Sequence, residues 1–156
     1  MAAKDLSEKG AKLRALKILT DRDKTEKELR DKLSRDGYDE GVIDSAVEYV
    51  RDYGYIDDAR YAENYASYRM NDKSRIQLAV ELRRRGVDEG VIDSVFDRLY
   101  EGFDESEQII RLIEKKLKGT YPDCLKEIHD EKQRAALYRS LQGKGYPFET
   151  IRRLLS

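Results

Sequence analysis

An internal repeat limits what this chain can fold into more than any other feature of its 156 residues. The segment GYDEGVIDS at residues 37–45 returns as GVDEGVIDS at residues 86–94, a shift of 49 positions. Leucines stand eight and four positions before the first glycine of each segment; these residues are Leu29, Leu33 and Gly37, then Leu78, Leu82 and Gly86. Self-similarity at a fixed period of this size is typical of tandem arrays of one supersecondary unit.

A fainter third copy follows the second. Leu137, Leu141 and Gly145 keep the same spacing, now 59 positions beyond the second copy. Since this shift exceeds the first by ten positions, we expect an insertion of about that length within residues 119–129.

Each copy predicts three helices. Thr25-x-x-Glu28 and Ser74-x-x-Gln77 have the form of capping boxes that open a middle helix, and the glycine 12 positions after each hydroxyl residue closes it. Apolar residues at i, i+1, i+4, i+5 and i+8, counted from positions 42 and 91, form the stripe of a third helix. The first helix of the first copy is marked by its aliphatic residues Leu13, Leu16, Ile18 and Leu19.

These patterns predict an all-α fold of about nine helices, arranged as three tandem three-helix repeats. With 40% charged residues, much of the chain must face water, so we expect an elongated, curved array. The expected repeat boundaries are 1–54, 55–102 and 103–156.

Composition argues against chemistry within the chain. Cys124 and His129 are the only cysteine and histidine, too few for a disulfide framework, a zinc site or a nucleophile–base pair. Asp57 and Asp58 could together hold Mg²⁺, but directly before a helix they are better interpreted as an N-cap and its dipole partner. We expect no catalytic residue, no metal, no cofactor, no membrane span and a cytoplasmic location.

Charge is distributed unevenly along a chain whose net charge is only −1. Residues 36–63 hold nine acidic and two basic side chains, and residues 69–85 hold six basic and two acidic ones. Three tyrosines precede the basic stretch at helical spacing. The candidate partner-binding residues are Arg69, Lys73, Arg75, Arg83, Arg84 and Arg85 with Tyr61, Tyr65 and Tyr68.

Two alternatives stay open for this set. The charges can be solvated helix faces with i,i+4 pairs, and the tyrosines can fill half-buried core positions. A helix-turn-helix reader of DNA is disfavoured, because the expected recognition helices, residues 40–53 and 89–101, are not basic.

Residues 54–62, GYIDDARYA, resemble the GYIDD-x-x-(F/Y)-A segment of the bacterial recombination regulator RecX. The flanking patterns Thr25-x-x-Glu28-Leu29-x3-Leu33 and Ile76-x5-Leu82-x3-Gly86-Val87 stand at that family's spacing. The motif and structural residues are Gly54, Tyr55, Ile56, Asp57, Asp58, Ala62, Leu29, Leu33, Gly37, Leu78, Leu82 and Gly86.

The resemblance implies a regulator that binds the RecA recombinase and its filament on single-stranded DNA. It implies inhibition of the ATPase, strand-exchange and co-protease activities of RecA, and so moderation of recombination, DNA repair and the SOS response. A monomer is expected, and the near-neutral charge leaves room only for weak direct contact with DNA. The alternative functions are a sequence-tolerant single-stranded DNA-binding protein and a general helical-repeat adaptor.

Overall fold

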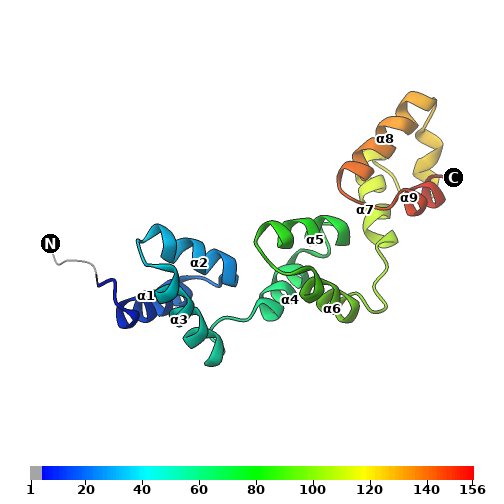
Figure 1. Cartoon of the computed structure of the whole chain (residues 1–156). Helices are drawn as coiled ribbons and strands as arrows, with labels where there is room; N and C mark the ends of the chain where they lie inside the picture. The colour runs from blue at the N-terminus through cyan, green and yellow to red at the C-terminus, as the bar shows by residue number, and fades with distance from the viewer. Residues whose placement is uncertain (1–4) are drawn as a thin grey trace. The chain divides into compact units, whose positions relative to one another are not determined.

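The computed structural model describes residues 5–156, and in that range it contains nine α-helices, one 3₁₀-helix and no strand (Figure 1). The first three helices are α1 (Glu8–Asp21), α2 (Glu26–Arg35) and α3 (Glu40–Asp52). The next three are α4 (Asp58–Arg69), α5 (Arg75–Arg84) and α6 (Glu89–Leu99). The last are α7 (Ser106–Leu117), the 3₁₀-helix η1 (Asp123–Glu127), α8 (Glu131–Gly143) and α9 (Phe148–Leu155). The predicted all-α fold of three tandem three-helix repeats is confirmed.

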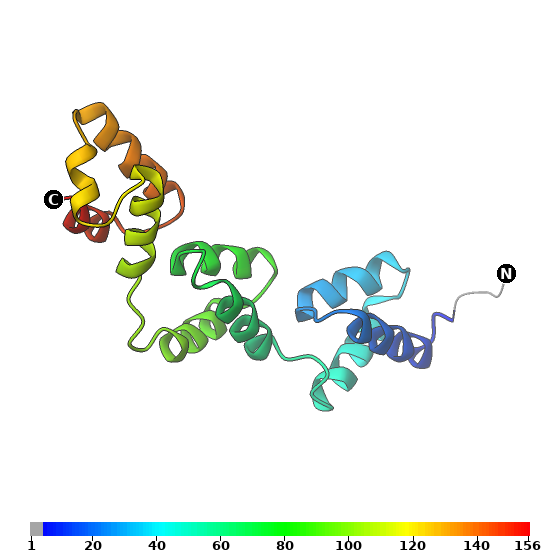
Figure 2. The same ribbon diagram turned by 180° about the vertical axis from the view of Figure 1, so that it is seen from behind.

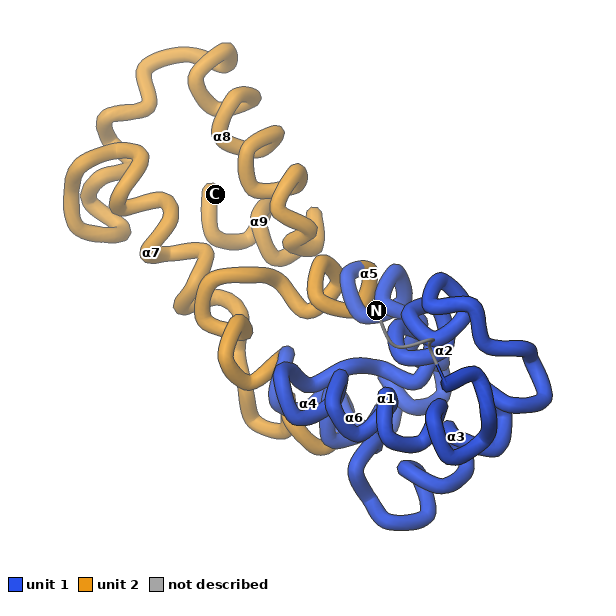
Figure 3. The backbone as a smooth tube through the Cα atoms, turned by 90° about the vertical axis from the view of Figure 1, so that its left-hand side faces the viewer, with its two compact units in different colours: residues 1–65, 81–97 blue, residues 66–80, 98–156 orange. Residues whose placement is uncertain are grey.

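Contacts within the chain define two compact units (Figure 3). The first unit comprises residues 1–65 and 81–97, and the second comprises residues 66–80 and 98–156. The second repeat contributes to both units, because the division passes through α4, α5 and α6.

In the first unit, α1 and α3 lie side by side and α2 lies against both of them (Figures 1 and 2). The core contains small residues of α1 and aliphatic residues of the other helices; its members are Ala11, Ala15, Ile18, Leu29, Leu33, Tyr38, Ile43, Ala46, Val47, Val50 and Ile56. Alanines allow α1 to approach α3 closely. As a result Leu13, which marks this helix in the sequence, points away from the core and is 58% exposed.

The core of the second unit is formed by α7, α8 and α9 with the inserted segment. Its buried members are Ile109, Ile113, Cys124, Leu137, Leu141, Tyr146, Ile151, Leu154 and Leu155. The insertion contains a cis Tyr121–Pro122 peptide bond and η1, and the Tyr121 hydroxyl donates to the Leu154 carbonyl at 2.8 Å. The inserted 3₁₀-helix therefore packs against α7, and the Tyr121 hydroxyl joins the insertion to α9.

The repeated glycines end the middle helices in one shared conformation. Gly37, Gly86 and Gly145 have φ values of +98°, +93° and +91°, a left-handed region that side chains with a β-carbon rarely adopt. The third, faint copy thus has the same helix stop as the first two.

The positions at which helices start follow the sequence patterns at some helices but not at others. Thr25 and Glu28 form the complete capping box that their spacing predicts. Asp104-x-x-Glu107 has the spacing of a helix start, but α7 begins at Ser106. The Asp104 carboxylate accepts from the backbone N–H of Ser106 and so lies in the turn before the helix.

Candidate partner interface

The predicted contact residues fall into both units, and three of those in the first unit, Tyr61, Tyr65 and Arg85, form a packed cluster. The rings of Tyr61 and Tyr65 stack with centroids 6.0 Å apart. Arg85 Nη1 donates to the Tyr61 hydroxyl at 2.9 Å, and its guanidinium lies 4.8 Å from the Tyr65 ring centroid. The same guanidinium is 3.7 Å from a carboxylate oxygen of Glu28 on α2. Arg85 therefore connects the end of α5 to both α4 and α2.

Tyr61 and Tyr65 both pack at least partly inside the first unit. Tyr65 is buried and its hydroxyl donates to Glu81 Oε1 at 3.0 Å. Tyr61 is half-buried, and desolvation raises the pKa of its hydroxyl above the ordinary value, with the Glu28 carboxylate adding to the shift. The burial of Tyr65 favours its interpretation as a core residue with a polar tip, Tyr61 is only half-buried, and the place of both on a contact surface stays a prediction.

The other two arginines of the 83–85 run differ from Arg85. Arg83 forms an ion pair with Glu89 at 2.8 Å. Arg84 is exposed and makes no ion pair with any residue that the structure describes. It borders an open hollow of about 450 Å³, whose other lining residues are Lys27, Glu28, Asp31, Tyr65, Glu81 and Arg85.

In the second unit the predicted residues have more varied surroundings. Tyr68 is 82% exposed, so it is not a core residue, unlike Tyr65. The Arg75 guanidinium lies 5.1 Å from the ring centroid of Tyr100. Arg69, the last residue of α4, and Lys73, in the turn that follows, are half-buried, and the Lys73 N–H donates to the Arg69 carbonyl.

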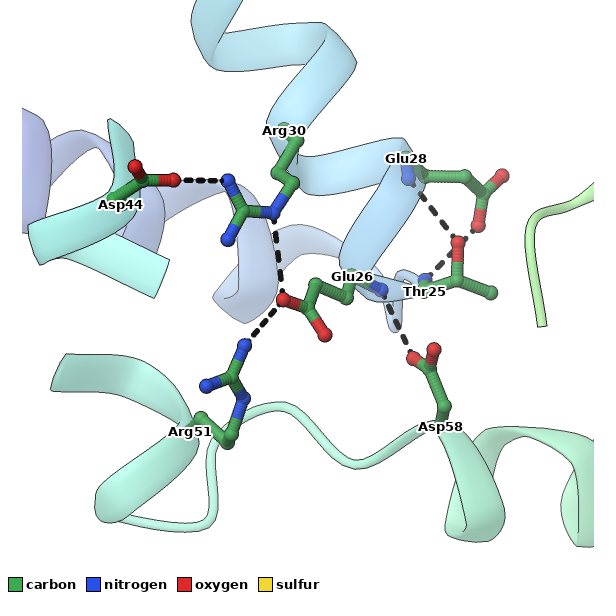
Figure 4. Close-up of polar contacts among 7 residues, drawn as sticks. All are labelled: Thr25, Glu26, Glu28, Arg30, Asp44, Arg51 and Asp58. Carbon is green, nitrogen blue, oxygen red and sulfur yellow. Dashed lines mark hydrogen bonds and ion pairs between the residues drawn. The ribbon is translucent and has the colours of Figure 1, made fainter. Parts of the chain in front are cut away.

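The GYIDD segment joins the first repeat to the second (Figure 4). Asp57 is an N-cap, since its carboxylate accepts from the N–H of Arg60 at 3.1 Å. Asp58 instead accepts from the N–H of Glu26 at the start of α2, at 2.9 Å. Burial raises the pKa of the Asp58 carboxyl, and the nearby charge of Glu26 raises it further.

Thr25 completes this junction from the other side. Its hydroxyl accepts from the N–H of Glu28 and donates to the carbonyl of Arg85 at 2.6 Å. Glu26 also forms ion pairs with Arg30, at 3.3 Å, and with Arg51 (Figure 4).

The same junction recurs in the second unit. The Ser74 hydroxyl donates to the Lys144 carbonyl at 2.8 Å, as Thr25 does to the Arg85 carbonyl. The N–H of Arg75 donates to a Glu105 carboxylate oxygen at 2.6 Å, as the N–H of Glu26 does to Asp58. The middle helices of the first two repeats, α2 and α5, thus each begin with a hydroxyl and an N–H that bind the following repeat.

Our sequence analysis treated these hydroxyls only as helix caps and missed their second partner. A signal was present: both caps are hydroxyl residues, which can donate and accept at once, and an acidic residue opens the first helix of the following repeat in both cases. The hydrogen bonds of the junctions hold neighbouring helices together, and their arrangement is that of a structural contact rather than of a catalytic site.

Three findings concern other kinds of site. In the part of the chain that the structure describes, no group of three or more histidine, cysteine, aspartate or glutamate residues is placed to hold a metal ion. Cys124 is buried, and desolvation raises the pKa of its thiol. Among the helices of residues 5–156, none is both long and apolar enough to cross a bilayer.

Family models match the chain in three consecutive segments. The first three-helix domain of RecX matches residues 11–49, the second matches residues 57–95 and the third matches residues 104–155. A crystal structure of RecX from Lactobacillus salivarius has the same fold, with a TM-score of 0.80 at 23% identity over 95% of this chain and 94% of that one.

Curated relatives agree with the family models. The regulatory protein RecX of Vibrio cholerae serotype O1 is 35% identical over 138 residues, which is 88% of this chain and 86% of the relative. That of Clostridium perfringens strain 13 is 34% identical over 86% of this chain, and the match spans only 62% of the clostridial protein's length. With all three of its helical repeats matched in order, the chain belongs to the RecX family of regulatory proteins.

Proposed function

We propose that this chain binds the RecA recombinase on its filament with single-stranded DNA and lowers the ATPase, strand-exchange and co-protease activities of RecA. Such a protein acts in the cytoplasm and moderates recombination, DNA repair and the SOS response by binding, without catalysis of its own. The observation that carries the proposal is the occurrence of all three domains of a regulatory family, in order, between residues 11 and 155.

The proposed contact surface comprises the nine basic and tyrosine residues considered above. Within it, Arg84 is the sharpest place to test the idea, because it is exposed and has no ion pair within the described residues. Reversing Arg83 or Arg85 is a poorer test. Their guanidiniums already bind Glu89 and Tyr61, so a reversal would disturb the fold along with the surface.

The test is a titration of the purified chain into RecA assembled on single-stranded DNA, with ATP hydrolysis as the readout. We expect Arg84→Glu to weaken inhibition about tenfold, since reversing one charge at a complementary interface costs on the order of 1–2 kcal/mol. The matched control is Arg35→Glu, because Arg35 occupies the same position at the end of α2 and is exposed too. Equal inhibition by both variants would remove Arg84 from the contact surface.

A second measurement separates the alternative functions. Binding of the chain to a labelled single-stranded oligonucleotide without RecA should be weak at low salt and absent at physiological salt. Tight DNA binding that needs no RecA would favour the single-stranded DNA-binding function. Failure to affect RecA at all would favour a general adaptor.

A further inference from the structure

The outer face of the first repeat is apolar where α1 and α3 meet. We call this the α1–α3 face and define it by Leu13, Leu16, Tyr49 and Tyr53. Leu13 is 58% exposed and Tyr53 is 65% exposed. The rings of Tyr49 and Tyr53 lie 4.9 Å apart, and the face is hollowed by a pocket of about 480 Å³ that Leu13, Leu16 and Tyr49 help to line.

Comparison with the other repeats shows that the fold does not require these apolar residues. The buried alanines of α1 align with those of α4, Ala11 with Ala62 and Ala15 with Ala66. In this alignment of α1 with α4, Asn64 takes the place of Leu13 and Ser67 that of Leu16. When α3 is aligned with α6, Arg98 takes the place of Tyr49. In the third repeat, Arg111 stands in the place of Leu13. An apolar surface confined to one of three similar repeats is typical of an interface.

Charges flank the α1–α3 face with opposite signs on its two sides. Glu8 at the start of α1 also lines the hollow, and its carboxylate accepts from the Ser45 hydroxyl. The other charges considered are Lys9, Lys12 and Lys17 along α1, and Glu48 and Asp52 along α3. None of these five side chains forms an ion pair with a residue that the structure describes. The Lys12 ammonium lies 5.3 Å from the Tyr49 ring centroid, so the cations border the apolar surface directly.

The two helices run in the same direction. Ser45 donates to the Glu8 carboxylate, and one turn further along both helices Lys12 meets Tyr49. A two-fold axis along the groove between α1 and α3 would therefore place α1 of one copy over α3 of another. The lysines of each copy would then face the acids of its partner, around a shared apolar centre. The face is self-complementary, as a two-fold interface must be.

We propose that a second copy of this chain covers the α1–α3 face and forms a symmetric, reversible dimer. Apolar contacts supply the affinity, and the charges fix the orientation, because exposed ion pairs contribute little by themselves. Four apolar side chains make a small interface, so the dimer forms only at high protein concentration. This proposal replaces the monomer expected from the sequence, and it does not depend on RecA binding.

Sedimentation velocity over a range from about 1 to about 500 µM tests the dimer. We expect the wild-type sedimentation coefficient to rise from that of a monomer to that of a dimer. Leu13→Glu should weaken dimerisation at least about tenfold, since it places a charge in the apolar centre. Ile76→Glu is the matched control, because Ile76 is an aliphatic side chain of similar exposure, 53%, in the second repeat. Far-UV circular dichroism checks that both variants keep the wild-type helicity.

Charge exchange tests the orientation. Lys12→Glu with Lys17→Glu makes the α1 side predominantly acidic, with Lys9 kept, and Glu48→Lys with Asp52→Lys makes the α3 side basic. Each doubly substituted protein should self-associate at least about tenfold more weakly than the wild type. A mixture of the two should associate again, because each substituted side chain then faces one of opposite charge. Fluorescence anisotropy of one labelled variant, titrated with the other, reports this pairing.

Three outcomes would overturn the proposal. These are a wild-type protein that stays monomeric at every concentration, a dimer that Leu13→Glu leaves intact, and a charge-exchanged mixture that does not associate. If the wild type is monomeric and Leu13→Glu reduces RecA inhibition, the face binds a different protein. None of these results bears on Arg84, so the dimer and the RecA proposal can fail separately.

Discussion

At the scale of single residues, the Thr25 hydroxyl makes two hydrogen bonds that serve different purposes. It accepts from the N–H of Glu28 within its own helix and donates to the Arg85 carbonyl of the next repeat. Its side chain is fully buried, so water cannot replace either partner when the hydroxyl is removed.

We predict that Thr25→Ala lowers the free energy of unfolding by about 1–3 kcal/mol, the sum of a lost N-cap and an unpaired buried carbonyl. Thr25→Ser keeps the hydroxyl and should lower it by less than about 1 kcal/mol. Urea unfolding followed by circular dichroism measures both. Thr20→Ala is the control, because that exposed hydroxyl only bonds back to the Leu16 carbonyl. If alanine and serine at position 25 gave equal stability, the hydroxyl would have no role in the junction.

Asp58 makes stability depend on pH. Its folded-state pKa is raised above the ordinary value of 3.8, chiefly by burial. Its contribution to stability is therefore complete below pH 3.8 and is lost as the pH rises through the folded-state pKa.

We predict that Asp58→Asn is at least as stable as the wild type at neutral pH, because the amide oxygen still accepts from the Glu26 N–H without a buried charge. The advantage should shrink as the pH approaches 4. Urea unfolding at several pH values measures the difference between the two proteins. Asp58→Ala, which lacks the acceptor, should be less stable than Asp58→Asn throughout. An asparagine advantage that does not change with pH would contradict this account.

At the scale of helices, the three middle-helix glycines share a conformation but not an environment. A β-carbon on Gly86 would lie 2.4 Å from the Lys27 β-carbon of the preceding repeat. On Gly37 it would meet nothing closer than a Leu6 methyl group at 4.0 Å. Gly86 is thus needed both for its positive φ and for the approach of a neighbouring helix, whereas Gly37 is needed for φ alone.

We predict that Gly37→Ala lowers the free energy of unfolding by about 1–2 kcal/mol, the cost of a left-handed residue with a side chain. Gly86→Ala should cost about 1–3 kcal/mol more, because Lys27 must also move. Thermal unfolding of the two variants gives the comparison, and Gly37→Ala serves as the matched control. If both substitutions lowered the free energy of unfolding equally, Lys27 would move away from the new β-carbon without a measurable loss of stability.

The features predicted from sequence are those that depend on local spacing. The capping box at Thr25 and the three glycine stops follow from residues fewer than 15 positions apart, and the repeat follows from the return of such a local pattern after 49 and 59 positions. The hydroxyl bonds of the junctions join residues 60 and 70 positions apart, so their partners do not follow from local spacing; only the recurrence of a hydroxyl cap and of an acidic residue in the next repeat indicates them. Which of Arg83, Arg84 and Arg85 forms an ion pair could not be predicted either, since this depends on where Glu89 and the distant Glu28 lie in the fold.

Leu13 shows why a helix can be predicted correctly while its buried face is not. Aliphatic residues occur around much of α1, and their spacing alone does not distinguish the side that meets α3. That side is selected by the alanines, whose small side chains permit close packing.

At the scale of the whole molecule, each repeat is stabilised in part by its neighbour. Both junctions use the same two hydrogen bonds, so stability should be approximately a sum over repeats and junctions. The boundaries 1–54, 55–102 and 103–156 remain our proposal for the repeats. Ile56 makes the first boundary testable, because it lies just beyond residue 54 and is buried in the core of the first repeat.

We predict that a fragment of residues 1–57 is more stable than one of residues 1–54 by about 1.5–3 kcal/mol, the contribution of one buried isoleucine. A fragment of residues 1–102 should be more stable again, because it restores the Asp58 and Arg85 partners of α2. Thermal unfolding followed by far-UV circular dichroism ranks the three. Introducing Thr25→Ala into both the 1–57 and 1–102 fragments isolates the junction, since the hydroxyl bonds to Arg85 only in the longer one. If the substitution lowers the free energy of unfolding of the two fragments equally, the repeats are stabilised independently and the Thr25–Arg85 hydrogen bond adds no stability.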